Sequence, residues 1–180
     1  MKIGILNLQG AVTEHQQMLQ NLGVETVLIK NKTDLTGIDG LILPGGESTV
    51  MKKLLIKNNL FAPLKELIQA GLPTFGTCAG MVLLSQTDGF NLINGEIVRN
   101  GFGRQKQSFE ESLNVQGLNA PFHAVFIRAP YLSSVNHDVQ VLAKIDDKIV
   151  AAKKDHVLVT AFHPELTNDP SLHRLFLDMI

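Results

Sequence analysis

The chain has little cysteine and no long hydrophobic run. It contains one Cys among its 180 residues, so no disulfide can form within it, and a single free thiol is typical of a reducing compartment. No apolar run approaches the roughly 18 residues that a membrane-spanning helix requires. The apolar stretch at the amino terminus is interrupted by Asn7, Gln9 and Gly10 before the core of a signal peptide could form. These absences predict a soluble, cytoplasmic protein.

Neither sign of charge is in excess. The 16 basic and 17 acidic residues nearly cancel, which argues against a nucleic acid partner, because holding a phosphate backbone requires a basic surface. Hydrophobic residues make up 44% and charged residues 18% of the chain, a composition that excludes a disordered tail or a coiled coil. A chain of this length predicts one globular domain over residues 1–180.

The first half of the sequence alternates short apolar runs with segments of helical periodicity. The runs predict buried strands, and the segments between them, some of which end at a glycine, predict helices. This alternation is typical of a parallel sheet with helices on both faces. The expected strands are 2–8, 26–30, 40–44 and 74–77, and the expected helices are 11–22, one capped by Ser48, 61–70 and one that begins at Cys78.

The second half has a different pattern, in which strand-like segments follow one another with little helix between them. This succession predicts an antiparallel extension of the same sheet. A last helix is expected over 171–179, after Asn168-Asp169-Pro170. The expected strands of this half are 95–99, 108–115, 123–130, 139–145, 148–154 and 156–164.

Cys78 lies between two glycines, in the segment GTCAG, where an expected strand meets an expected helix. The spacing G-x-nucleophile-x-G is typical of a nucleophile elbow, in which the nucleophile occupies a strained turn and the glycines leave room around it. At the start of a helix, unpaired amides and the helix dipole favour the thiolate over the thiol. The alternative is a buried cysteine with incidental glycines.

His163 is the best candidate for the base that a nucleophilic cysteine needs. It ends an apolar segment and is followed by Pro164 and Glu165. Residues two apart in an extended chain point to the same side, so the Glu165 carboxylate can orient the His163 ring. A histidine in a surface turn is the alternative reading of this segment.

Two other histidines are expected to be solvated: His15, on a helix, and His137, in a turn. A zinc site built on His163 and Glu165 is disfavoured, because such sites usually have at least three protein ligands and the sequence has neither an HExxH motif nor a second cysteine. We therefore expect no metal.

The segment LILPGGEST, residues 41–49, ends an expected strand with two glycines. Bare backbone at Gly45 and Gly46 lets N–H groups approach a ligand closely. Two N–H groups directed at one oxygen form an oxyanion hole, and the expected pair is Gly46 with Ala79, the residue after Cys78. By itself, the segment also fits a tight turn between a strand and a helix.

The motifs LILPGGEST, GTCAG and FHPELT, in this order, resemble those of the triad-type (class I) glutamine amidotransferases, which hydrolyse glutamine with Cys, His and Glu. Across nearly the whole chain, NLQGAV, FGRQ and FIRAP are similar to the glutaminase subunits of pyridoxal 5′-phosphate synthase, the vitamin B6 branch of that family. The resemblance implies an α/β, three-layer, flavodoxin-like fold. Its central sheet would be mostly parallel.

On matching positions, the resemblance implies that Cys78 is the nucleophile, His163 the base and Glu165 the partner that orients it. It also implies a binding site for L-glutamine, whose planar α-carboxylate suits an arginine guanidinium. The residues implied for that site are Gly46, Glu47, Ser48, Arg104, Ile127 and Arg128.

The resemblance also implies a partner, because ammonia released into bulk water would be protonated. The partner would be the synthase subunit, a (β/α)₈ barrel (TIM barrel), in a hetero-oligomeric complex. Pyridoxal phosphate is then the product of the complex, and this chain needs no cofactor. Gln9 and Gly10 follow the first strand, at the edge where parallel sheets gather ligands, and are expected to couple partner binding to the oxyanion hole.

Two alternatives stay open on the sequence. The glutaminase subunit of another amidotransferase, such as imidazole glycerol phosphate synthase, would share the triad. A non-catalytic, redox-sensing protein with a cysteine elbow would keep Cys78 without needing Glu165 or Arg104.

Overall fold

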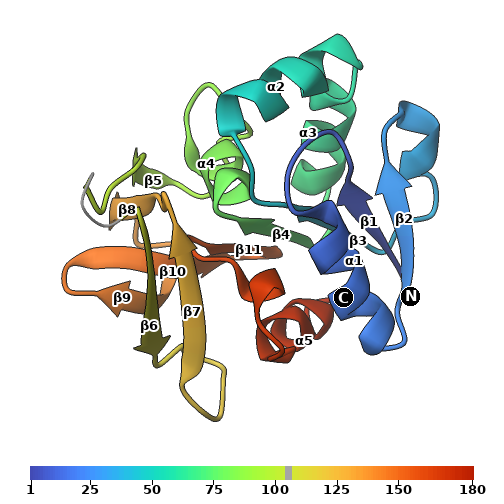
Figure 1. Ribbon diagram of the computed structural model, residues 1–180. Helices are drawn as coiled ribbons and strands as arrows, with labels where there is room; N and C mark the ends of the chain where they lie inside the picture. Colours follow the sequence, from blue (N-terminus) through green and yellow to red (C-terminus); the bar gives the residue numbers. More distant parts are fainter. Residues whose placement is uncertain (104–106) are drawn as a thin grey trace.

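The computed structural model describes residues 1–103 and 107–180. Within these residues the strands form a nine-stranded mixed sheet in the order β2-β1-β3-β4-β11-β10-β8-β5, with β9 paired to β10, and a separate two-stranded sheet of β6 and β7. Helices lie on both sides of the large sheet (Figure 1). The expected α/β class with three layers and a mostly parallel centre is confirmed.

The parallel part of the sheet consists of short apolar runs that are buried on both faces. In β3, for example, Leu41, Ile42 and Leu43 are fully buried, which explains why these runs show no alternation of polar and apolar residues. The five strands are β1 (Lys2–Leu6), β2 (Glu25–Ile29), β3 (Gly40–Leu43), β4 (Thr74–Thr77) and β11 (Val157–Thr160).

Side chains of β4 show which helices cover which face. The Phe75 ring packs against the rings of His173 and Phe176 on one face, whereas Gly76 faces Leu84 on the other. The first face carries α1 (Val12–Asn21) and α5 (Ser171–Leu177). The second carries α2 (Ser48–Lys57), α3 (Phe61–Gln69) and α4 (Ala79–Ser85). Two short 3₁₀ helices, η1 (Lys32–Leu35) and η2 (Pro164–Leu166), lie in loops.

The second half of the chain extends the sheet with antiparallel strands, but two details of the prediction are wrong. The strand β11 pairs parallel with β4 and antiparallel with β10, so it joins the two halves of the sheet. The strands β6 and β7 pair only with each other in the described residues. The strands of this half are β5 (Gly95–Val98), β6 (Ser108–Leu113), β7 (Phe122–Ile127), β8 (Tyr131–Val135), β9 (Gln140–Ile145) and β10 (Lys148–Lys154).

Other differences are local. The sequence pattern does not predict β8, because Ser133 and Ser134 interrupt its apolar residues. Glu47, not Ser48, caps α2: its carboxylate accepts hydrogen bonds from the N–H groups of Thr49 and Val50 at 3.1 and 2.8 Å. No helix in the described part of the chain is long and apolar enough to cross a membrane.

Candidate active site

The candidate site lies at the carboxyl ends of three adjacent parallel strands. The strand β4 lies between β3 and β11, so the segments that follow these strands meet at the same edge of the sheet. Thr77 of β4 is in register with Thr160 of β11, which brings Cys78 and His163 out of neighbouring strands at nearly the same level. Gly45, which follows β3, lies directly against the His163 ring at this edge.

Cys78 occupies a strained elbow between β4 and α4. Its backbone angles are φ 48° and ψ −100°, a region that residues with a side chain rarely adopt. Its N–H donates a 2.8 Å hydrogen bond to the carbonyl of Thr160, and the residue is 7% exposed. As the cap of α4, Cys78 lies beside the unpaired amides of the first helical turn.

The two glycines that flank Cys78 permit a close approach of β4, α4 and β3. A Cβ on Gly76 would lie 2.5 Å from Leu84 Cδ1 and 2.8 Å from the carbonyl carbon of Gly80. A Cβ on Gly80 would overlap the carbonyl oxygen of Leu43. The glycine spacing noted in the sequence therefore reflects packing around the elbow as well as the turn itself.

His163 and Glu165 form a buried pair beside the cysteine. His163 Nδ1 lies 2.7 Å from Glu165 Oε1, and the two residues are 7% and 5% exposed. This contact leaves Nε2 of His163 for Cys78. Burial alone would lower the pKa of His163, but hydrogen bonds to Cys78 and Glu165 together with their negative charges raise it to about 10. The ring is therefore an imidazolium at neutral pH, with Cys78 and Glu165 as its hydrogen-bond partners.

The extended backbone expected between His163 and Glu165 is not what the structure has. Glu165 belongs to the 3₁₀ helix η2, which His163 caps, so the carboxylate reaches the ring through a tight turn and not along an extended strand. The N–H of His163 donates to the carbonyl of Val125 at 2.8 Å. The β6–β7 sheet thus helps to hold the histidine in place.

The negative charge of Glu165 is held in the interior. Burial would raise the pKa of its carboxyl, but His15 and the hydrogen-bonded His163 outweigh burial and lower the pKa. His15, expected above to be solvated, is fully buried, with Nε2 3.5 Å from Glu165 Oε2. That expectation is wrong for His15, whereas His137 is exposed as expected.

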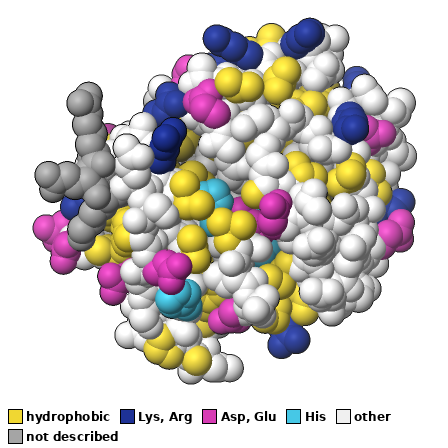
Figure 2. All heavy atoms as spheres, viewed as in Figure 1, with side chains coloured by type: hydrophobic (Ala, Val, Ile, Leu, Met, Phe, Trp, Pro, Cys, Tyr) yellow, Lys and Arg dark blue, Asp and Glu magenta, His cyan; other side chains and the backbone are white. Residues whose placement is uncertain are grey.

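A cavity of about 430 Å³ opens in front of Cys78, within the ~300–1,000 Å³ usual for small-molecule sites. Ile127, 39% exposed, and Leu166, 42% exposed, contribute apolar surface to it. Figure 2 shows histidine atoms among hydrophobic side chains near the centre of one face of the molecule. The sequence-predicted residues that line the cavity are Gln9, Gly10, Gly46, Glu47, Ser48, Cys78, Ala79, Ile127, Arg128 and His163.

Arg104, the remaining residue of the expected glutamine site, lies outside the described residues. Sequence reasoning missed Arg99 and Asn100, which line the cavity. Arg99 Nη2 is 3.2 Å from Glu47 Oε1 and 3.1 Å from Thr49 Oγ1. Both residues belong to the RNGFGRQ segment. The segment was therefore recognised as part of the site, but only Arg104 was assigned to it.

The loop of Gln9 and Gly10 is in contact with the loop after β3. Gln9 Oε1 accepts a 2.8 Å hydrogen bond from the N–H of Glu47, and the N–H of Ala11 donates to the carbonyl of Gly45 at 3.0 Å. Gly10 has φ +106°, and a Cβ there would overlap the Gly45 oxygen. A shift of one loop must therefore displace the other.

Comparison with known proteins identifies the family. The model of the SNO glutamine amidotransferase family matches residues 5–180. The chain belongs to this family. It is 52% identical to a pyridoxal 5′-phosphate synthase subunit PdxT of Listeria monocytogenes, over 99% of this chain and 98% of that protein. It is 51% identical to a protein of the same name from Carboxydothermus hydrogenoformans, over 100% of this chain and 98% of that protein.

Among solved structures, one described as a glutamine amidotransferase superposes with a TM-score of 0.92 at 40% identity, covering 98% of this chain and 97% of that one. The similarity to this glutamine amidotransferase therefore extends over the whole fold, the extended sheet and the β6–β7 pair included. As a member of the SNO family, the chain is a glutamine-hydrolysing enzyme.

Proposed function

We propose that this chain is the glutaminase subunit of a pyridoxal 5′-phosphate synthase, acting as one glutamine amidotransferase domain over residues 1–180. The observation that carries the proposal is the arrangement of Cys78, His163 and Glu165 at one cavity, in a chain about half identical to synthase subunits over its full length. The reaction converts L-glutamine and water into L-glutamate and ammonia.

In the first half of the reaction, the Cys78 thiolate attacks the side-chain amide carbon of glutamine. The negative charge moves to the amide oxygen, where the N–H groups of Gly46 and Ala79 stabilise it. Ala79 is the first residue of α4, so its N–H has no partner within the helix. As the C–N bond breaks, the imidazolium of His163 gives its proton to the leaving nitrogen, and ammonia and a thioester form.

In the second half, His163 acts as a base. Formation of the thioester removes the thiolate, one of the groups that raise the pKa of His163, so the ring becomes able to take a proton from water. The resulting hydroxide attacks the thioester carbon and the C–S bond breaks. Glutamate leaves, and the thiolate–imidazolium pair is restored.

Glutamine would be held by the segments that line the cavity. Gly46, Glu47 and Ser48 approach it from the start of α2, and Ile127 and Arg128 from the end of β7. The guanidinium of Arg128, and that of Arg104, would bind the α-carboxylate.

The ammonia would pass to a synthase subunit, for which we propose a TIM barrel in a hetero-oligomeric, cytoplasmic complex. The contacts between the Gln9–Gly10 loop and the Gly45–Gly46 loop support a coupling role, since a partner that touches the first loop would move the oxyanion hole. This coupling would make glutaminase activity depend on the partner.

The test is glutamate release from L-glutamine, measured with and without the synthase subunit. We expect high activity only in the complex and none with Cys78→Ala, while His123→Gln, on the exposed face of β7, retains full activity. Substantial glutaminase activity in Cys78→Ala would refute the nucleophile. Equal turnover by the isolated chain and the complex would refute the coupling but leave the triad intact.

A further inference from the structure

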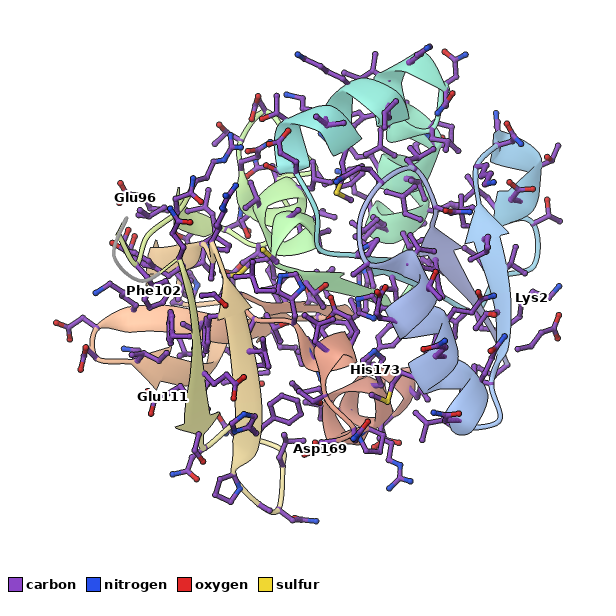
Figure 3. The ribbon with its side chains drawn as sticks, in the orientation of Figure 1. Lys2, Glu96, Phe102, Glu111, Asp169 and His173 are labelled. Carbon is purple, nitrogen blue, oxygen red and sulfur yellow. The ribbon has the colours of Figure 1, made fainter. Side chains whose placement is uncertain are left out.

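A second pair of histidines lies behind the triad, on the side away from the cavity. His15 of α1 and His173 of α5 are both fully buried, and Figure 3 shows His173 between these two helices. His15 Nδ1 lies 2.9 Å from His173 Nε2. Both histidine rings pack edge-to-face against the Phe75 ring, with interplanar angles of 80° and 79°, which restricts their rotation.

The other nitrogen of His15 faces the triad. Nε2 lies 3.5 Å from Glu165 Oε2 and 3.2 Å from Thr77 Oγ1. Glu165 Oε2 has no other close polar partner among the described residues, while Oε1 is bonded to His163. His15 therefore contacts the half of the Glu165 carboxylate that His163 does not use.

We propose that His15 is a positioning residue of the glutaminase site: held in one tautomer by His173, it directs a neutral N–H at Glu165 and fixes the carboxylate that orients His163. This role rests on the proposed glutaminase function. It extends the Cys78–His163–Glu165 chain by two residues that do not touch the substrate cavity.

The hydrogen-bond pattern determines the tautomer. A direct contact between two ring nitrogens requires one N–H donor and one lone pair. If His15 Nδ1 donated, its Nε2 lone pair would face the Glu165 carboxylate, and the N–H at His173 Nδ1 would be buried with no partner in the described part of the chain. If His173 Nε2 donates, the N–H of His15 lies at Nε2, toward Glu165 and Thr77, and His173 Nδ1 carries an unpaired lone pair, which costs less than an unpaired N–H.

Burial keeps both rings neutral at pH 7 and above. Burial, followed by the neighbouring His15, lowers the pKa of His173 to about 3 against the opposing effect of Glu165. Burial also lowers the pKa of His15, where Glu165 and Glu14 oppose it and His163 adds to it. A neutral donor can orient Glu165 without neutralising it, so the whole negative charge stays available to the imidazolium of His163.

A metal ion between these rings is not the explanation. The nitrogens contact each other directly at 2.9 Å, which leaves a proton and no space for an ion between them. No group of His, Cys, Asp and Glu among residues 1–103 and 107–180 has the arrangement of a metal site.

The first test compares variants in the complex with the synthase subunit. His15→Phe removes the donor and should lower kcat by roughly ten- to a hundredfold, the usual effect of losing a residue that orients a catalytic group, with KM for glutamine little changed. Since Glu165 then loses a partner of its charged form, the acidic limb of the pH profile of kcat/KM should move to higher pH. His15→Gln places an amide N–H at the same point and should restore much of both.

The matched control is His156→Leu. His156 is a partly buried histidine that is hydrogen-bonded to the carbonyl of Ile68, and it lies beyond the amino end of β11, far from the triad. It should lose stability and keep the wild-type pH profile. If folded His15→Phe also keeps the wild-type kcat and acidic limb, the proposal is wrong.

The second test does not depend on activity or on the variants. Nitrogen chemical shifts of the histidine rings in the wild-type chain distinguish the two tautomers and the cation. We expect His15 and His173 to be neutral at pH 7 and above, each with its proton on Nε2. A cationic His15 at neutral pH, or a proton on its Nδ1, would overturn the proposal. Absence of glutaminase activity in the wild-type complex would overturn only the function on which the proposal rests.

Discussion

Gly45→Ala should test how closely the loop after β3 confines the His163 ring. A Cβ on Gly45 would overlap His163 Cε1 and lie 2.8 Å from Nδ1 and 3.3 Å from Nε2. Carbon atoms pack against neighbours at about 3.5–4.0 Å, so the ring must move by about 1 Å. The 2.7 Å bond to Glu165 Oε1 would then be lost or bent.

A displacement of about 1 Å in a catalytic group typically costs on the order of 10²-fold in rate. We therefore expect Gly45→Ala to lower kcat for glutamine hydrolysis in the complex by about this factor. KM should change less, because the three atoms nearest to the new Cβ all belong to the His163 ring. The assay is steady-state glutamate release with a titration of glutamine.

The control is Gly37→Ala, where a Cβ would meet no atom within 4 Å but φ is +71°. It should cost ~1–2 kcal/mol of stability from backbone strain and leave kcat unchanged. Thermal unfolding should show a loss of stability for Gly37→Ala as well, so that a fall in kcat with Gly45→Ala alone cannot be attributed to lower stability. If Gly45→Ala keeps kcat within about threefold of wild type, the ring is not confined by the loop after β3, and this reasoning about the site fails.

Three further outcomes follow from the structure. Gly10→Ala should abolish partner-dependent glutaminase activity, because φ is +106° and the new Cβ would overlap the Gly45 oxygen; wild-type turnover in the complex would contradict this. Glu47→Ala removes the cap of α2 and should lower the free energy of unfolding by about 1 kcal/mol, measured by urea denaturation; an unchanged midpoint and slope would show that the cap contributes nothing. The pKa of His163 is raised from 6.5 to about 10, so its charge contributes stability that is fully present below pH 6.5 and is lost as the pH rises through about 10. The difference in unfolding free energy between wild type and His163→Gln should therefore shrink between pH 6 and pH 10. A constant difference would refute the raised pKa.

The nucleophile and its base could be predicted from the sequence because their constraints are local. Cys78 needs a glycine on either side within five consecutive residues, and His163 and Glu165 are two residues apart. Each pattern arises from a turn whose geometry depends on its own residues. The relative placement of the two turns then follows from the parallel pairing of β4 with β11.

The role of His15 could not be predicted in the same way, although a signal existed. Val12, His15, Met18 and Leu19 are the buried residues of α1, and their spacing places His15 on the apolar stripe of the helix. Periodicity shows that such a histidine is buried, but not what it meets there. Its partners come from η2 and α5, about 150 residues later in the chain, and only the fold brings them together.

The separate β6–β7 sheet escaped prediction for a related reason. In Phe122–Ile127, buried residues alternate with more exposed ones, as in a strand with one solvated face. Such a strand is equally compatible with the edge of the main sheet and with a separate hairpin. Which of the two forms depends on long-range pairing, and residues of one strand carry little information about its neighbour. The consequence for the site is direct, since the carbonyl of Val125 accepts the hydrogen bond from the N–H of His163.

The strand β4 connects the helices on both faces of the sheet to the catalytic residues. Successive residues of a strand point to opposite faces, so Gly76 lets α4 approach on one face, while Phe75 and Thr77 contact the histidine pair on the other. Cys78 ends the same strand. The elbow is therefore set from one face by the packing of α4, and the triad is supported from the other by α1 and α5. A change in α5, such as the loss of His173, can alter glutamine hydrolysis without touching the cavity, because its effect passes through His15 and Glu165 to the ring that serves the cysteine.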